Sequence, residues 1–153
     1  MRDLAKRFPS NPILLPKDIT PSNSKLKVIC VLNPGAFCFA GKIWLMVRVA
    51  ESVAEKEGFI FFPSMNEFGK VDVIEISLSD PELVATDARV VNYRGLDYLT
   101  TVSHFRLLSS ADGIHFAEEH DFCGIFGVGE LERFGIEDCR VVNIDGTYYV
   151  TYT

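Results

Sequence analysis

The feature that most limits how this chain can fold is an internal repeat with a spacing of 51 residues. Residues 87–100 and 138–151 read DARVVNYRGLDYLT and DCRVVNIDGTYYVT, and they carry the same residue at eight of fourteen positions. Each copy has β-branched and aromatic residues on both sides of a glycine turn, which predicts two short strands. Repeats of about 50 residues that hold several short strands are typical of β-propeller blades. The repeat therefore predicts an all-β chain of propeller type.

Strand-forming residues also dominate the rest of the chain. The segments expected to be strands are 27–32, 42–49, 58–62, 71–77, 89–93, 98–108, 140–144 and 148–153. The hairpin turns are expected at Asn66–Gly69, Asp112-Gly113 and Asp145-Gly146. Residues 50–57 suggest at most one helical turn in a surface connector. Residues 1–26 contain four prolines and predict an extended N-terminal arm instead of a strand.

The repeat divides the remaining chain into blades. One blade is expected over about 27–77, a second over about 87–137, and the start of a third over 138–153. This amounts to roughly two and a half blades, whereas propellers have about four to eight. Because the last strand would leave an apolar edge unpaired, we expect a truncated chain, or one that pairs with a second polypeptide or another copy of itself.

Charge and composition exclude several classes of protein. The 15 basic and 21 acidic residues give a net charge of −6, which argues against a nucleic-acid partner. No apolar run reaches the length of about 18 residues that a membrane span needs, and no signal peptide is visible. We therefore expect a cytoplasmic protein, or a periplasmic or secreted one if a signal peptide was removed.

Cysteines and histidines do not form a metal-binding pattern. No CxxC motif occurs, so the cysteines are expected to be small buried thiols in a reducing compartment. These residues are Cys30, Cys38, Cys123 and Cys139, and the scattered histidines are His104, His115 and His120. The segment His120–Cys123 offers too few ligands for a metal site. We expect neither a metal nor an organic cofactor.

The repeat also carries candidate chemistry. Alternation along a strand places Asp138 and Arg140 on one face, as it does Asp87 and Arg89, so each pair could be a structural ion pair. The second copy alone adds a neighbouring carboxylate, Glu137. Two carboxylates in a propeller channel could cleave a glycosidic bond, where one acts as the acid. A neighbouring carboxylate raises the pKa of such an acid and an arginine lowers it, and spacing leaves open which prevails.

Several segments together resemble glycoside hydrolase family 130. The segments that carry the resemblance are Arg7–Leu14, Asn33–Phe37, Val47–Glu51, Ser109–Phe116, Gly135–Arg140, Ile144–Tyr149 and Thr151–Thr153. They follow the order of the family and cover essentially the whole chain. The resemblance implies a five-bladed β-propeller that acts on β-mannoside oligosaccharides with inversion. Its members are mannoside phosphorylases or β-1,2-mannosidases.

The resemblance also implies roles for single residues. Asp138 matches the proposed general acid, whose proton is thought to reach the glycosidic oxygen through a substrate hydroxyl. Asn33 and Arg48 match residues that line the sugar site. The other substrate-binding candidates are Asp87, Arg89, His104, Glu137 and Arg140. Cys139 stands where the family has proline, a change that would loosen the approach to Asp138.

The sequence is compatible with three functions. The first is cleavage of β-mannosides by phosphorolysis, with inorganic phosphate as co-substrate, or by hydrolysis; the family's phosphate-binding residues lie downstream of the Thr-Tyr-Thr strand. The second is a non-catalytic sugar-binding propeller or an inactive truncated fragment. The third is a glycosidase of furanosides, for which Asp18 is the candidate base.

Overall fold

The computed structural model describes residues 7–85, 87–122 and 124–153, and strands dominate this part of the chain. The strands are β1 (Leu26–Phe39), β2 (Lys42–Val53), β3 (Phe59–Met65), β4 (Val71–Ser77), β5 (Leu83–Ala85), β6 (Val90–Tyr93), β7 (Leu96–Leu99), β8 (Val102–Ser110), β9 (Ala117–Glu118), β10 (Arg140–Ile144) and β11 (Thr147–Thr151). Two short 3₁₀ turns, η1 (Pro16–Asp18) and η2 (Glu130–Glu132), complete the elements. The all-β expectation is confirmed. The described residues contain no helix that could span a membrane.

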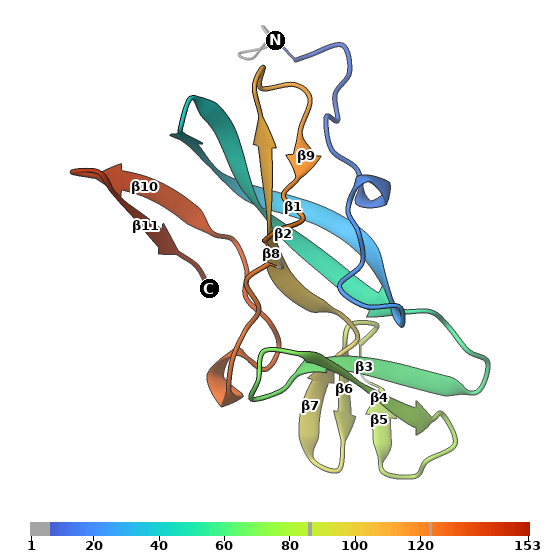
Figure 1. Ribbon diagram of the computed structural model, residues 1–153. Coiled ribbons are helices and arrows are strands. Elements are labelled where there is room, and N and C mark those ends of the chain that lie inside the picture. Colours follow the sequence, from blue (N-terminus) through green and yellow to red (C-terminus); the bar gives the residue numbers. More distant parts are fainter. Residues whose placement is uncertain (1–6, 86, 123) are drawn as a thin grey trace, which may run out of the picture.

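The strands form four antiparallel sheets. The largest has the order β1-β2-β8-β9, and the others are β3-β4, β5-β6-β7 and β10-β11. Figure 1 shows the large sheet in the upper part of the molecule, β3 to β7 below it, and the β10-β11 hairpin to one side. The large sheet joins residues 26–53 to 102–118, so it crosses the expected boundary between the blades 27–77 and 87–137. The described residues do not close a propeller, and the number of blades stays a prediction.

Some local expectations were wrong. The strand expected over 98–108 is two strands, because Thr100 donates its backbone N–H to the carbonyl of Arg89 and the chain then leaves that sheet for β2. Of the connector expected over 50–57, residues 50–53 belong to β2, where Val53 pairs with Leu26 of β1, and residues 54–58 link β2 to β3 without a helix. The N-terminal arm is extended only in part, because η1 interrupts it. Among the cysteines, Cys139 is buried as expected, Cys30 is half-buried, Cys38 is exposed, and Cys123 lies outside the described residues.

The large sheet is covered on both faces by different parts of the chain. On one face, Val49 and Leu108 pack against Ile19 of the N-terminal arm. On the other, Met46 and Phe105 pack against Ile136 and the segment that follows it. Because side chains alternate along β2 and β8, neighbouring residues on one strand face different layers. This alternation decides which candidate residues can meet.

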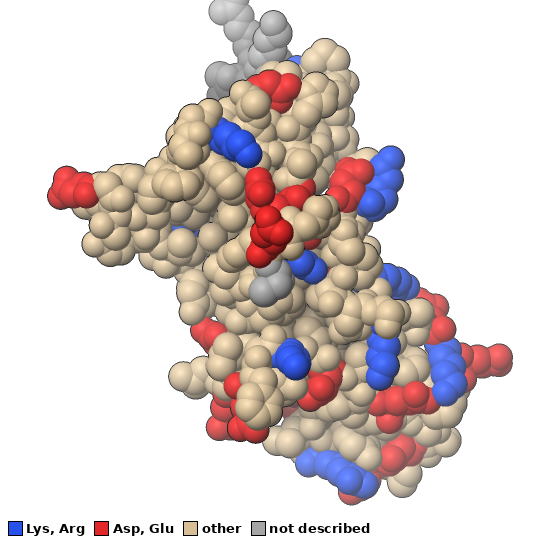
Figure 2. Space-filling model, viewed as in Figure 1, with Lys and Arg blue, Asp and Glu red and all other residues tan. Residues whose placement is uncertain are grey.

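The surface differs between the two ends of the molecule. On the view in Figure 2, charged side chains gather over β3 to β7, whereas the projecting β10-β11 hairpin carries few apart from its acidic tip. Its exposed residues include Val142, Ile144, Tyr149 and Val150. The hairpin thus presents apolar side chains to solvent, and among the described strands β11 pairs only with β10.

Candidate functional site

Four of the expected site residues meet on one face of the large sheet. The guanidinium of Arg48 lies 2.5 Å from Oε1 of Glu137 and 3.0 Å from Oδ1 of Asp138. The side-chain amide of Asn33 donates a hydrogen bond of 2.8 Å to the same Oδ1 atom of Asp138. The cluster of Asn33, Arg48, Glu137 and Asp138 therefore joins β1, β2 and the segment before β10. We call it the Asp138 cluster.

A bulge in β1 places Asn33. Leu32 pairs with Arg48 and Gly35 pairs with Met46, so Asn33 and Pro34 together stand opposite a single residue of β2. Such a bulge redirects side chains next to functional sites. Asn33 adopts a φ of 36°, in the left-handed region that asparagine tolerates better than most residues. The bulge turns its amide toward Asp138.

The segment that carries the two carboxylates is fixed to the edge of β8. Gly135 forms a parallel bridge with Ser103, and the N–H of Ile136 donates a 3.0 Å hydrogen bond to the Ser103 carbonyl. A Cβ atom on Gly135 would lie 2.1 Å from that carbonyl oxygen, and its φ is +95°, so only glycine fits there. The buried side chain of Ile136 holds the segment to the core. Glu137 and Asp138 follow directly from this anchor.

Ser103 is a member of this site that the sequence reasoning missed. Its hydroxyl accepts a 3.2 Å hydrogen bond from Nε of Arg48 and donates one of 3.3 Å to Oε1 of Glu137. It is buried, with 3% of its surface exposed. Ser103 thus holds the arginine and the glutamate together. Only the pairing of β2 with β8 brings it there, and no motif in the sequence indicates that pairing.

The contacts of Asp138 favour its ionised form. The hydrogen bond from Asn33, followed by the one from Arg48, holds the pKa of the Asp138 carboxyl below its ordinary value. The positive charges of Arg48 and Arg140 act in the same direction. About two fifths of each acidic side chain remains exposed, whereas the Arg48 side chain is 17% exposed. The site therefore offers solvent-accessible carboxylates around a mostly covered cation, a set that can bind the hydroxyl groups of a polar ligand.

Cys139 and Arg140, which follow Asp138 in the chain, fix the position of this segment. The Cys139 thiol is fully buried and donates to the carbonyl of Met46 at 3.1 Å, and burial raises its pKa. Arg140 donates from Nη1 to the Cys139 carbonyl at 2.7 Å. The thiol at the position where the resembling family has proline therefore packs in the core and ties the segment to β2.

The structure does not bring Asp87 and Arg89 to the cluster. Both are exposed at the entry to β6, where Oδ1 of Asp87 accepts a 2.6 Å hydrogen bond from the backbone N–H of Arg89. The Arg89 side chain is 3.9 Å from the same oxygen. Figure 1 shows β6 in the lower part of the molecule, away from β10. Their role in substrate binding stays a prediction.

His104 lies on the opposite face of the sheet from Arg48. It is fully buried, its Nε2 accepts a 3.1 Å hydrogen bond from Arg106, and its ring stacks on Phe126 at 4.4 Å. Burial, followed by the charge of Arg106, lowers its pKa to about 3, so the imidazole is neutral at physiological pH. Asp18, the candidate base of a furanosidase, accepts a hydrogen bond from the Leu15 N–H within the N-terminal arm. Neither residue contributes to the Asp138 cluster.

The described residues include no group of three or more His, Cys, Asp and Glu side chains that could hold a metal ion.

Comparisons with known proteins point to one enzyme. No family model matches the chain. The chain is 32% identical over 157 aligned residues to the β-1,2-mannobiose phosphorylase of Listeria innocua, and the match covers 96% of this chain. A solved structure of that phosphorylase in complex with β-1,2-mannobiose superposes with a TM-score of 0.80 and 31% identity over 95% of this chain. The chain is thus homologous to this phosphorylase, and it spans 43% of the length of that enzyme, both in the sequence match and in the structural match.

Proposed function

We propose that this chain is part of a family 130 glycoside phosphorylase that cleaves a β-mannoside with inversion. The observation that carries the proposal is the Asp138 cluster. Asn33, Arg48 and Asp138 are far apart in sequence and meet within hydrogen-bond distance. By the resemblance to the family, Asn33 and Arg48 match residues that line the sugar site, and Asp138 matches the proposed general acid. The homologous phosphorylase acts on β-1,2-mannobiose, which makes this disaccharide the proposed substrate.

In the proposed reaction, inorganic phosphate attacks the anomeric carbon on the face opposite the glycosidic oxygen. The bond to that oxygen breaks, and the oxygen takes a proton that Asp138 supplies through a sugar hydroxyl. The products are α-mannose 1-phosphate and mannose. Arg48 and Asn33 bind hydroxyls of the sugar whose anomeric carbon reacts, and Glu137 keeps the Arg48 guanidinium in place.

The low pKa of Asp138 bears directly on this role. A general acid must be protonated, yet Asn33 and Arg48 stabilise the carboxylate in the chain without ligand. We propose that sugar hydroxyls accept the hydrogen bonds of these two donors when substrate binds. Asp138 then loses its two stabilising partners, and its pKa rises toward the value that an acid needs.

A second chain is part of the proposal. The β10-β11 hairpin exposes Val142, Ile144 and Tyr149, and an unpaired apolar edge strand favours pairing with another strand. We propose that a second polypeptide or another copy of this chain covers it. Native mass spectrometry should then show a complex, and Tyr149→Lys should weaken it. A wild-type chain that is monomeric at micromolar concentration would exclude another copy of the chain as the partner, and a whole protein in which no other strand covers this hairpin would contradict this part altogether.

The activity is tested with the whole protein of which we propose this chain to be part, with β-1,2-mannobiose as substrate, in buffer with and without inorganic phosphate. We expect mannose and mannose 1-phosphate in equal amounts, formed only when phosphate is present. The α-1,2-linked disaccharide serves as the control substrate and should not react. Mannose released without phosphate would instead identify a hydrolase.

The alternative is a sugar-binding chain without catalysis, and the ionised state of Asp138 favours it. In that case calorimetry would detect binding of β-1,2-mannobiose while neither buffer yields product. Absence of both binding and turnover would contradict both functions.

A further inference from the structure

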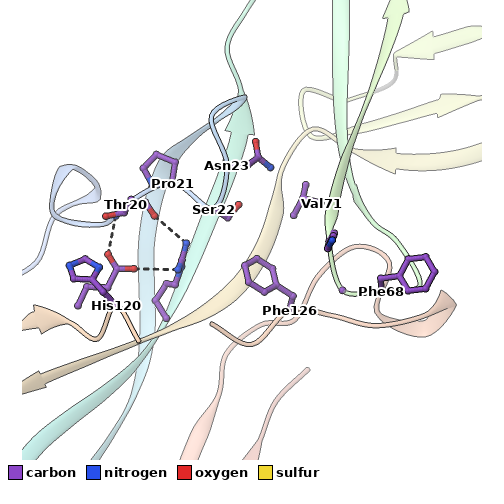
Figure 3. Close-up of a pocket in the computed structure, with 12 residues that line it drawn as sticks. Thr20, Pro21, Ser22, Asn23, Phe68, Val71, His120 and Phe126 are labelled. Atoms are coloured by element: carbon purple, nitrogen blue, oxygen red, sulfur yellow. Dashed lines mark hydrogen bonds and ion pairs between the residues drawn. The ribbon is translucent and has the colours of Figure 1, made fainter. Parts of the chain in front are cut away.

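A cleft lies on the face of the large sheet that is turned away from the Asp138 cluster. It has a volume of about 710 Å³, within the range of small-molecule sites. Figure 3 shows that three separate parts of the chain surround it: the N-terminal arm at Thr20–Asn23, the β3-β4 turn at Phe68–Val71, and the segment around His120 and Phe126. The alternation along β8 places Arg106 on this face and Ser103 on the other. The cleft is therefore separate from the proposed catalytic site.

One side of the cleft is a polar group held in a fixed arrangement. Nη1 of Arg106 lies 3.4 Å from Oε1 of Glu118, and Nη2 donates to the carbonyl of Thr20 at 3.2 Å. The N–H of Thr20 donates in turn to Oε2 of Glu118 at 3.1 Å. The Arg106 and Glu118 side chains are only 10% and 6% exposed. Their opposite charges compensate each other, so this side favours a neutral polar ligand over an ion.

Another side of the cleft is aromatic. One face of the Phe126 ring stacks on His104 with an interplanar angle of 10°, and Figure 3 shows the ring in the middle of the cleft. Phe68 stands at the rim and is 76% exposed. Stacking on His104 holds the Phe126 ring in one orientation, so it can act as a rigid platform.

The cleft also has hydrogen-bonding side chains from several segments. Asn23, Lys70 and His120 line the cleft and belong to three different segments. The Asn23 side chain uses Oδ1 to accept from the Lys25 N–H, which turns its amide nitrogen toward other partners. Together the walls offer donors from several directions around an apolar ring face.

From this geometry we propose that the cleft is a second carbohydrate-binding site, for a neutral mono- or disaccharide. A pyranose ring has an apolar C–H face that packs on an aromatic ring, and equatorial hydroxyls that reach donors at its rim, so it matches both kinds of wall. The choice of mannose as the sugar rests on the proposed function. The site binds without catalysis and gives the chain a second point of contact with an oligosaccharide.

The test is a titration of the ¹⁵N-labelled chain with β-1,2-mannobiose, followed by amide NMR shifts. We expect saturable shifts at Gly69, His120 and Phe126, which persist when Asp138→Asn alters the other site. Phe68→Ala and Phe126→Leu should each weaken this binding roughly two- to twelvefold, the range of a lost aromatic contact. Phe39→Ala, an exposed ring outside the cleft, is the matched control and should not change it.

The pattern of shifts separates this inference from the proposed function. Shifts confined to Asn33, Gly35 and Ser103 would overturn the cleft site and leave the Asp138 cluster as the sugar site. Shifts confined to the cleft would support the second site and contradict the proposed function. Equal shifts at the cleft with glycerol at the same concentration would show that no sugar site exists there, and no shifts at all would overturn both proposals.

Discussion

The two copies of the repeat form the same hairpin but differ in the surroundings of their aspartates. In the first copy, β6 and β7 turn at Arg94-Gly95, and in the second, β10 and β11 turn at Asp145-Gly146. All four turn residues have positive φ, as a type I′ turn requires. In both copies the asparagine before the turn accepts a 3.1 Å hydrogen bond from the turn glycine. Identical residues therefore produce an identical local structure.

The aspartates that open the two copies differ because different strands lie opposite them. Asp87 interacts with its own neighbour, Arg89, at an exposed position. Asp138 has a φ of +52° and interacts with Asn33 and Arg48, which come from β1 and β2. In the first copy, the expected ion pair of Asp87 and Arg89 has a long distance of 3.9 Å. In the second copy, Asp138 pairs with Arg48 instead of Arg140. The hairpin is thus a property of the repeat, whereas the candidate site depends on the strands that face it.

The largest expected difference between the copies is in catalysis. Asp138→Asn removes the proposed acid and should lower turnover of β-1,2-mannobiose by about 10²- to 10⁴-fold, the usual contribution of a general acid. Asp87→Asn makes the same change at the equivalent position of the first copy, which carries no proposed acid, and should lower turnover far less than Asp138→Asn does. Initial rates at saturating phosphate measure both. Equal losses in the two variants would show that the surroundings of Asp138 do not distinguish it.

Stability should also respond differently at two glycines, one in the segment that leads into the second copy and one in the hairpin turn of the first copy. Gly135→Ala forces a Cβ atom against the Ser103 carbonyl and should lower the free energy of unfolding by about 3 kcal/mol or more. Gly95→Ala, at a turn with open space around it, should cost only about 1 kcal/mol for its positive φ. Urea unfolding of both variants tests this difference. Similar losses would mean that the anchor at Ser103 has no special importance.

A smaller effect is expected where Ser103 joins the sheet to the second copy. Ser103→Ala removes the hydrogen bonds to Arg48 and Glu137 and should weaken binding of β-1,2-mannobiose by about 1 to 2 kcal/mol, or roughly five- to thirtyfold. Ser79→Ala, an exposed serine beyond β4, provides the control. Calorimetry on the two variants gives the comparison, and unchanged affinity in Ser103→Ala would remove this serine from the site.

The repeat and the motifs predicted part of this site and could not predict the rest. The hairpin turns could be predicted from the sequence because glycine and asparagine determine the backbone conformation of a turn locally. Asn33, Arg48 and Asp138 were identified through the resemblance to a family. Ser103 was missed because its contact with Arg48 spans 55 residues and depends on the register of β2 against β8. His104, whose role in substrate binding stays a prediction, lies on the other face of the sheet from Arg48 because of the alternation along β8. The positions of both Ser103 and His104 depend on the register between strands that are distant in sequence.

The smallest expected effect concerns acid stability. Because the pKa of Asp138 is lower in the folded chain than in the unfolded one, its contribution to stability is present above the unfolded value of about 3.9 and is lost as the pH falls through the folded value. Arg48→Met should therefore flatten the decline in stability below about pH 5. Arg89→Met is the control in the first copy and should keep the wild-type profile. Unfolding midpoints measured between about pH 3 and pH 7 test this.

The most direct test of the central claim is an NMR titration of the Asp138 carboxyl carbon. Hydrogen bonds from Asn33 and Arg48, and not the repeat itself, lower the pKa of this aspartate. The wild-type chain should show a pKa for Asp138 below the ordinary value of about 3.9, and Arg48→Met should raise it. An ordinary pKa in the wild type, or the same pKa in both proteins, would contradict the account.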